Sequence, residues 1–244
     1  MYVNENQETN HIKRAIIVGS SSGIGKEMAL CLANQGWIVA ALGRRKQLLD
    51  ELSLKNKNIV SYEFDINETE IIQEKLHKIV DDIGGLNLFI ISAGVGFINS
   101  ELDFSIEQQT IKTNVEGFTK LMGWCYEFFR IKGCGQIAAI TSVSGLLEGV
   151  DGPSYSATKA YQINYIKTIR KMAKRACPKL VVTELRPGSV DTDMMKGEGH
   201  FWISKPEKAA ELACKAIMKK KNLQYISGKW RIIGVLLRFM SLWE

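Results

Sequence analysis

The stretch RAIIVGSSSGIG, residues 14–25, begins with an apolar run and ends in three glycines at the spacing G-x-x-x-G-x-G. The apolar run 14–19 predicts a buried strand, and segment 23–36 has apolar residues at helical spacing before it reaches Gly36, a helix-stop signal. Glycines between a strand and a helix permit a tight turn and let a pyrophosphate approach the helix N-terminus, where free N–H groups favour an anion. This stretch therefore predicts a dinucleotide-binding turn; the alternative is a glycine loop without a function.

The alternation of apolar runs and helical patterns continues along the chain. Further strands are predicted at 37–43, 59–65, 87–94, 136–142, 180–188 and 224–228, and helices at 45–52, 68–82, 103–132, 153–176 and 205–221. Apolar strands separated by helices are typical of a parallel sheet covered on both faces. We predict an α/β fold, a Rossmann-like doubly wound parallel sheet of about seven strands with helices on both faces, which binds ligands beyond the carboxyl ends of its strands.

Composition excludes several classes of function. The 244 residues are 45% hydrophobic and 24% charged, which is ordinary for a soluble globule, and a net charge of +6 is too scattered to predict nucleic-acid binding. Five separated cysteines and three isolated histidines indicate neither a disulfide framework nor a metal site. No apolar run approaches the roughly 18 residues that span a bilayer. We therefore expect a cytoplasmic protein with a flexible tail at 1–11 and one dinucleotide-binding catalytic domain at 12–228.

The end of the second predicted strand reads Gly43-Arg44-Arg45 and contains no acid. Dinucleotide folds often place a carboxylate there to bind the ribose 2′-hydroxyl of NAD. Two guanidinium groups suit a 2′-phosphate instead, because they bind it with charge-assisted hydrogen bonds. The sequence therefore favours NADP(H) over NAD(H), with Arg44 as the main contact. A solvated charge pair that opens a helix is the alternative.

The stretch SYSATK, residues 154–159, places Tyr155 and Lys159 one helical turn apart. A free tyrosine has a pKa near 10, and a neighbouring ammonium stabilises its phenolate, so the pair can form an acid/base centre. Ser142 ends the predicted strand 136–142, at the edge where this fold binds ligands, and its hydroxyl can polarise a carbonyl. Asn114 interrupts a helical pattern, and a buried asparagine in mid-helix needs a reason.

Together these residues resemble the short-chain dehydrogenase/reductase family over about residues 13–228. The resemblance rests on the glycine turn, Asp65, the tripeptide SAG at 92–94, Asn114, Ser142, Tyr155, Lys159 and the stretch PGSVDT at 187–192. It implies that Tyr155 is the general acid/base, that Lys159 lowers its pKa and holds the nicotinamide ribose, that Ser142 binds the substrate oxygen, and that Asn114 positions a water in a proton relay. The family usually has Asn-Ala-Gly where this chain has Ser92-Ala93-Gly94, for which we expect a modest effect on stability.

The resemblance also implies a cofactor site. Its residues are Gly19, Ser21, Ser22, Gly23, Ile24, Gly25, Arg44, Arg45, Asp65, Ile66, Ser92, Ala93, Gly94, Tyr155, Lys159, Pro187, Gly188, Val190 and Thr192. In it, Asp65 and Ile66 contact adenine. The nicotinamide is flanked by Pro187, Gly188, Val190 and Thr192. The implied reaction moves a hydride between NADP(H) and a carbonyl compound or secondary alcohol, with reduction favoured.

Two segments bear on the substrate and on partners. The loop 194–204 carries Met194, Met195, Phe201 and Trp202, which favour an apolar substrate or ordinary packing of a lid. Segment 229–244 is apolar and basic, and predicts a helix packed on the core or on a partner subunit, or one that contacts a membrane surface. The resemblance implies a homodimer or homotetramer. Two other functions stay open: a catalytically silent NADP(H)-binding redox sensor or scaffold, and a membrane-surface reductase of a lipid-linked or keto-sugar substrate.

Overall fold

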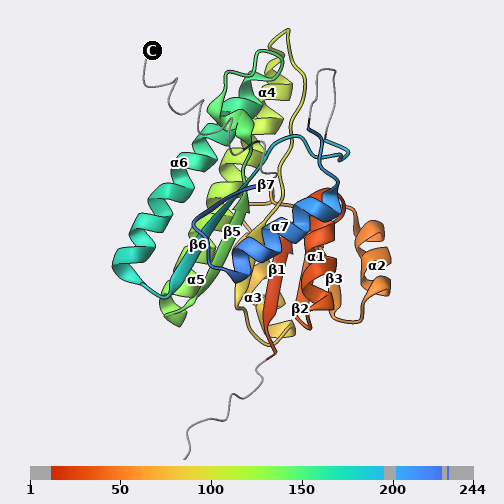
Figure 1. Ribbon diagram of the computed structural model, residues 1–244, viewed down its shortest axis with the longest axis vertical. Coiled ribbons are helices and arrows are strands. Elements are labelled where there is room, and N and C mark those ends of the chain that lie inside the picture. Colours follow the sequence, from red (N-terminus) through yellow and green to blue (C-terminus); the bar gives the residue numbers. More distant parts are fainter. Residues whose placement is uncertain (1–11, 195–201, 227–229, 231–244) are drawn as a thin grey trace, which may run out of the picture.

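A computed structural model describes residues 12–194, 202–226 and 230 of the chain (Figure 1). Its centre is a seven-stranded sheet with the order β3-β2-β1-β4-β5-β6-β7, in which every neighbouring pair is parallel. The strands are β1 (Arg14–Val18), β2 (Ile38–Gly43), β3 (Ile59–Glu63), β4 (Leu88–Ile91), β5 (Gly135–Ile140), β6 (Leu180–Pro187) and β7 (Leu223–Ile226). The order reverses between β1 and β4, so the carboxyl ends of these two strands form the crevice where such sheets bind ligands.

Helices cover both faces of the sheet (Figure 1). One face is covered by α1 (Gly23–Asn34), α2 (Lys46–Lys55) and α7 (Pro206–Met218), and the other by α3 (Ile72–Asp82), α5 (Phe118–Lys132) and α6 (Pro153–Ala176). Helix α4 (Phe104–Ile111) continues through a π-helix, η1 (Lys112–Gly117), into α5, and a short 3₁₀ helix, η2 (Val143–Leu146), follows β5. The predicted doubly wound fold is confirmed.

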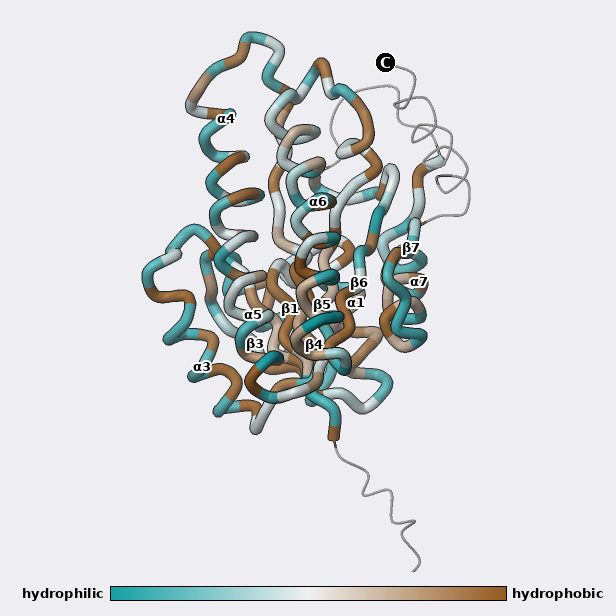
Figure 2. The backbone as a smooth tube through the Cα atoms, turned by 90° about the vertical axis from the view of Figure 1, so that its left-hand side faces the viewer, coloured by the Kyte–Doolittle hydropathy of each residue, from teal (hydrophilic) through white to brown (hydrophobic). Residues whose placement is uncertain are grey.

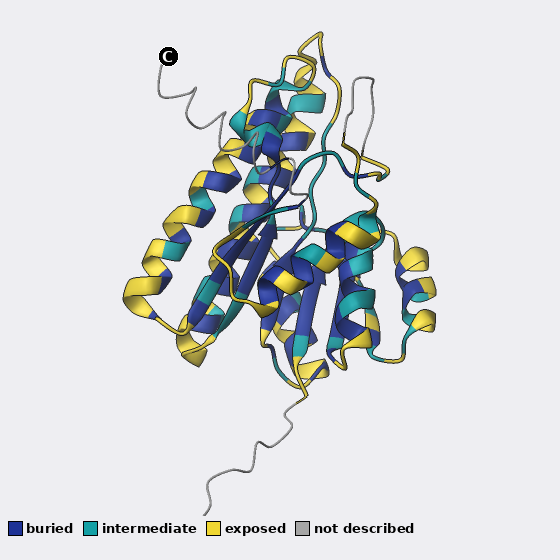
Figure 3. Ribbon diagram, viewed as in Figure 1, coloured by how far each residue is buried: buried dark blue, intermediate teal, exposed yellow. Residues whose placement is uncertain are grey.

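The sheet is buried because its strands face two hydrophobic cores. Ile16 and Ile17 are neighbours on β1, and both are fully buried. Ile16 belongs to the core under α3, α5 and α6, whereas Ile17 belongs to the core under α1 and α7. Each such side chain stabilises the fold by about 1.5–3 kcal/mol. Figure 3 shows the inner strands β1, β2, β4 and β6 buried along most of their length, and Figure 2 shows a hydrophobic centre.

The structure differs from the sequence prediction most clearly in one helical segment. The predicted helical segment 103–132 is divided by η1, where the helix widens around Asn114. The predicted tail 1–11 and all of segment 229–244 except Trp230 lie outside the described residues. Within the described ranges, no helix combines the length and the hydropathy that crossing a membrane requires. In that same part of the chain, no three histidine, cysteine or acidic side chains cluster as metal ligands would.

Candidate active site

The turn between β1 and α1 requires glycine at positions 19, 23 and 25. Gly19 and Gly23 have positive φ angles of 92° and 57°. A Cβ on Gly19 would lie 2.5 Å from the main-chain nitrogen of Ala93, and one on Gly25 would lie 2.1 Å from the carbonyl oxygen of Gly19. The N–H groups of Ser92 and Ala93 both donate to the carbonyl of Val18. The turn is therefore pressed against the end of β4, where the sequence places two of its predicted cofactor residues.

The N-terminus of α1 offers open N–H groups. Ser22 is the N-cap residue, but its side chain does not cap the helix, and the first turn contains no acidic residue. A helix end of this kind binds anions, because its N–H groups and its dipole are both unopposed. The Thr192 methyl lies 3.0 Å from the position that a Cβ on Gly23 would take. The residues present thus fit a pyrophosphate between the glycine turn and the segment that follows β6.

The two arginines after β2 lie in different surroundings. The Arg45 guanidinium donates to the hydroxyls of Ser21 and Ser22, over 2.9 and 2.6 Å, and lies 3.3 Å from the carboxylate of Asp193. Arg44 is exposed and lines a polar hollow of about 370 Å³ together with Glu63, Phe64, Asp65, Glu68 and Lys75. Arg45 is therefore the arginine in contact with the glycine turn, whereas the sequence predicts Arg44 as the main cofactor contact.

Asp65 and Ile66 follow β3 at the same edge of the sheet. The Asp65 carboxylate accepts a hydrogen bond from the N–H of Asn67 over 2.9 Å, which fixes the turn after the strand. Ile66 packs against Gly117 of η1, where a Cβ would lie 2.6 Å from the Ile66 side chain. Ile66 therefore connects the predicted adenine side of the site to the π-helix that carries Asn114. Ile24 lies in the first turn of α1 and packs, partly buried, against the core under α1 and α7.

Tyr155 and Lys159 lie on the same face of α6. Lys159 is 4% exposed, and its Nζ lies 5.7 Å from the centroid of the Tyr155 ring. Ser142 follows β5, and its Oγ accepts a hydrogen bond from the N–H of Ser144 over 3.1 Å. A Cβ on Gly96 would lie 2.7 Å from the Tyr155 ring, so the loop after β4 passes directly against the phenol. The structure thus brings the predicted serine, tyrosine and lysine to one place.

The surrounding protein disfavours charge on both members of the pair. Burial raises the pKa of Tyr155, and a hydrogen bond with Ser142 opposes this rise only in part. Burial also lowers the pKa of Lys159 to about 8. The structure therefore does not show the expected lowering of the phenol pKa, because removal of Tyr155 from water raises this pKa more than the hydrogen bond with Ser142 lowers it.

Asn114 lies inside η1 and fastens the loop after β4. Its Oδ1 accepts from the N–H of Val95 over 2.9 Å, and its Nδ2 donates to the carbonyl of Val95 over 2.7 Å and to Thr158 Oγ1 over 3.1 Å. These contacts satisfy a buried amide that would otherwise be costly. They also explain why an asparagine stands in mid-helix. The π-turn around it is a feature often found at functional sites.

Sequence reasoning missed Gln162, which is 1% exposed. Its Oε1 accepts from Lys159 Nζ over 2.9 Å, and its Nε2 donates to the carbonyl of Asn114 over 2.9 Å. The signal was present, because Tyr155, Lys159 and Gln162 lie at i, i+4 and i+7 and share one face of α6. A polar residue on the buried face of a helix requires a partner.

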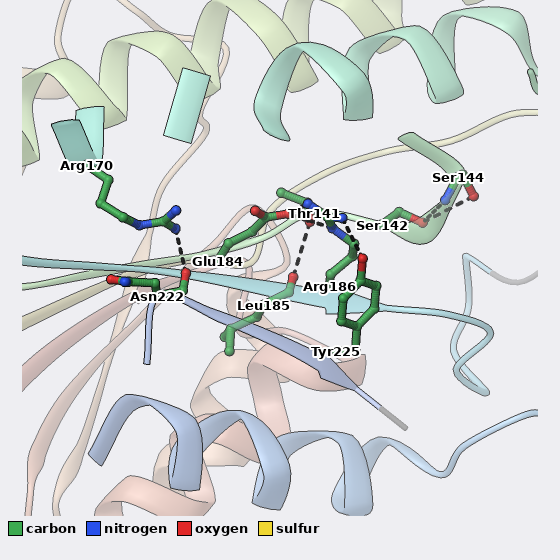
Figure 4. A network of polar contacts seen from close by, with 9 residues as sticks. All are labelled: Thr141, Ser142, Ser144, Arg170, Glu184, Leu185, Arg186, Asn222 and Tyr225. Carbon is green, nitrogen blue, oxygen red and sulfur yellow. Dashed lines mark hydrogen bonds and ion pairs between the residues drawn. The ribbon is translucent and has the colours of Figure 1, made fainter. Parts of the chain in front are cut away.

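A buried ion pair anchors the strand that leads to Ser142 (Figure 4). Glu184 and Arg186 are 1% and 4% exposed, and Arg186 Nε lies 2.7 Å from Glu184 Oε1. Thr141 Oγ1 donates to the same carboxylate over 3.0 Å, and Arg186 Nη1 donates to the Tyr225 hydroxyl over 2.9 Å. The network therefore ties together the ends of β5, β6 and β7 beside the candidate site.

The segment after β6 contacts a residue of the C-terminal segment. Pro187 ends β6, and a Cβ on Gly188 would lie 2.1 Å from Nε1 of Trp230, so the indole covers this glycine. Trp202 meets Trp230 edge to face at 5.9 Å between ring centroids. Val190 is buried and forms an isolated β-bridge with Ser204. Trp230 thus lies against the residues that the resemblance assigns to the nicotinamide, while Met195 and Phe201 lie outside the described residues.

Known proteins resemble this chain in both sequence and fold. The short chain dehydrogenase family matches residues 13–201. An uncharacterized oxidoreductase of Staphylococcus epidermidis is 29% identical over 188 residues, covering 76% of this chain and 81% of the relative. A 3-oxoacyl-[acyl-carrier-protein] reductase of Aggregatibacter actinomycetemcomitans is 31% identical over 192 residues, covering 74% and 77%. The crystal structure of a short chain dehydrogenase from Burkholderia cenocepacia in complex with NADP aligns with a TM-score of 0.81 at 20% identity, covering 93% of each chain, and supports the fold.

Proposed function

This chain belongs to the short-chain dehydrogenase family of oxidoreductases, and from this premise we propose that it reduces a carbonyl compound to an alcohol with NADPH. The observation that carries the proposal is the meeting of Tyr155, Lys159 and Ser142 beside a glycine turn that fits a pyrophosphate. A protein that only binds a dinucleotide needs the turn and can use the Lys159 ammonium to hold the ribose, but it has no need of an acid/base phenol on the same helix face.

The choice of NADP(H) rests on the residues after β2. Neither residue that follows Gly43 is acidic, so the position that often binds the ribose 2′-hydroxyl of NAD carries no carboxylate here. Arg44 and Arg45 are both exposed and carry guanidinium groups beside the polar hollow and the turn, respectively. The NADP in the related Burkholderia structure is consistent with this choice.

The proposed chemistry assigns one task to each side chain. When bound, the nicotinamide cofactor supplies the hydride. Tyr155 gives its proton to the substrate oxygen, and a raised pKa keeps that proton in place until it is needed. Ser142 donates a hydrogen bond to the same oxygen as its negative charge develops. Lys159 stabilises the phenolate left behind with its positive charge.

An apolar substrate is proposed because the segments after β4, β5 and β6 expose apolar side chains. These lie at the carboxyl ends of the strands, and Figure 2 shows hydrophobic stretches in the loops around α4. The exposed side chains are Phe97, Ile98, Leu102, Phe104, Leu147, Val150, Met194, Trp202 and Ile203. Their position at the carboxyl-terminal edge of the sheet suits a substrate whose apolar part is buried near Tyr155.

A substrate screen tests the proposal. NADPH oxidation is followed over aldehydes, ketones, keto-sugars and quinones, with NADH in parallel and the Tyr155→Phe variant as the control for background reduction. We expect turnover of at least one apolar carbonyl with NADPH. Tight NADPH binding without turnover of any compound would favour a redox sensor or scaffold, and failure to bind either cofactor would contradict the proposal.

A further inference from the structure

The Lys159 ammonium is buried with few partners. Among the described residues, its hydrogen-bond acceptors are Gln162 Oε1 at 2.9 Å and the carbonyl of Ile140 at 3.4 Å. An ammonium has three N–H donors, so these two contacts leave one donor free of a described protein acceptor. A buried charge depends on such contacts for its orientation and for its ionisation.

Gln162 is the stronger of the two contacts, and its own position is fixed. Its Nε2 donates to the carbonyl of Asn114 over 2.9 Å, so both ends of the amide are in use. Asn114 is held in turn by the main chain of Val95 and by Thr158. The Gln162 amide therefore connects η1 to the Lys159 ammonium on α6 through two hydrogen bonds.

We propose that Gln162 is a positioning residue that keeps the Lys159 ammonium protonated and directs its remaining N–H toward the phenol and the cofactor. The inference rests on the proposed function, in which Lys159 stabilises the phenolate of Tyr155. The neutral glutamine suits this task, because it accepts a hydrogen bond without cancelling the positive charge that the phenolate requires. A glutamate would hold the ammonium but neutralise it.

The direction of the effect follows from the groups around Lys159. Tyr155 is the titratable side chain facing it from its own helix. The groups contacting it from β5, from α6 and from the loop after β4 are uncharged, namely the Ile140 carbonyl, Gln162 and Gly94. Loss of the Gln162 acceptor therefore disfavours the ammonium, and the pKa of Lys159 falls below its present value of about 8.

Direct titration of Lys159 tests the proposal without a substrate. The ¹³Cε resonance is followed with pH in cofactor-free protein labelled at lysine, and is assigned by its loss in Lys159→Met. We expect Gln162→Met to lower the pKa of Lys159 by about one unit, and Gln162→Glu to raise it. The matched control is Thr183→Val, which changes a buried hydroxyl that has no described hydrogen-bond partner, and leaves the titration unchanged. An unchanged pKa in Gln162→Met would overturn the proposal.

Two further measurements complete the test. If Gln162→Met does not fold, Gln162→Asn, whose shorter amide does not span the two contacts, is expected to lower the pKa in its place. With a substrate of the wild-type protein, Gln162→Met should lower kcat about tenfold at unchanged KM, and shift the acid limb of alcohol oxidation to higher pH. A loss of kcat without that shift indicates a merely structural role and overturns the proposal. Absence of wild-type turnover counts against the proposed function alone, because the titration still decides the role of Gln162 at Lys159.

Discussion

The Nζ of Lys159 lies 5.7 Å from the centroid of the Tyr155 ring, and is held there by a side chain that reaches across from the same helix. Both groups are removed from water, so each disfavours its own charged form. The phenol is therefore set up to carry a proton at neutral pH, and the ammonium to support the phenolate that forms when the proton leaves.

Carbonyl reduction and alcohol oxidation should depend on pH in opposite ways. Because burial raises the pKa of Tyr155, the phenol keeps its proton through neutral pH. Reduction requires this proton, so kcat should be level through neutral pH and fall in the alkaline range. Oxidation requires the phenolate, and should rise about tenfold per pH unit up to that range. Profiles of kcat in both directions check this, and an oxidation rate that peaks in mildly acidic solution would count against it.

Lys159→Met should stabilise the cofactor-free protein. The pKa of Lys159 is lowered to about 8 in the folded state, so between that value and the ordinary lysine pKa the unfolded chain binds more protons than the folded one. The free energy of unfolding of the wild type therefore rises as pH increases through this window. At neutral pH the folded wild type bears the full cost of burying the Lys159 ammonium, on the order of 3 kcal/mol. The Lys159→Met variant avoids this cost. Urea unfolding of both proteins at neutral and alkaline pH measures the difference, which should shrink as pH rises; a variant less stable than wild type at neutral pH is the contrary result.

Arg44→Ala and Arg45→Ala should each weaken NADPH binding by about 10- to 100-fold and change NADH binding little, because each removes charge-assisted hydrogen bonds to the 2′-phosphate. Dissociation constants for both cofactors check this, with Lys46→Ala as a control, since Lys46 pairs with Asp50 on the surface of α2. Equal losses for NADPH and NADH in Arg45→Ala would instead indicate that Arg45 acts by holding Ser21 and Ser22.

Glu184→Ala should destabilise the fold by about 3–5 kcal/mol, because it leaves the Arg186 charge buried without its partner. Replacing both residues by methionine should recover most of this loss, since the pair is then removed together. Urea unfolding measures both variants, with Glu127→Ala as the matched control in an exposed pair with Arg130, which should change stability far less. A Glu184→Ala protein as stable as Glu127→Ala would show that the network does not anchor the strand that leads to Ser142.

Local patterns predict most of this fold, and the reason is visible at particular residues. Ile16 and Ile17 are both apolar because β1 is buried on both faces. The continuous apolar run therefore indicates a buried strand from the sequence alone. Pro187 ends β6 one residue before the predicted end of the strand, and Gly36, the predicted helix stop, follows α1 with a positive φ angle. These signals are local, since a proline or a positive-φ glycine limits its element whatever it packs against.

Long-range contacts are what the sequence does not show. The π-turn at Asn114 is secured by the main chain of Val95, nineteen positions earlier, and no local pattern encodes that pairing. Arg44 and Arg45 are adjacent and chemically equal, so only the fold reveals that Arg45 contacts the serines of the turn. Gln162 was visible as a polar residue on the buried face of α6, but its partners come from two elements.

The turnover of Tyr155→Phe tests the central claim most directly. The substitution removes one hydroxyl and keeps the ring beside Lys159. With any carbonyl substrate of the wild type, kcat should fall by about 100- to 10,000-fold, while NADPH affinity and thermal stability stay close to those of the wild type. Near-normal turnover by this variant would contradict the assignment of Tyr155 as the acid.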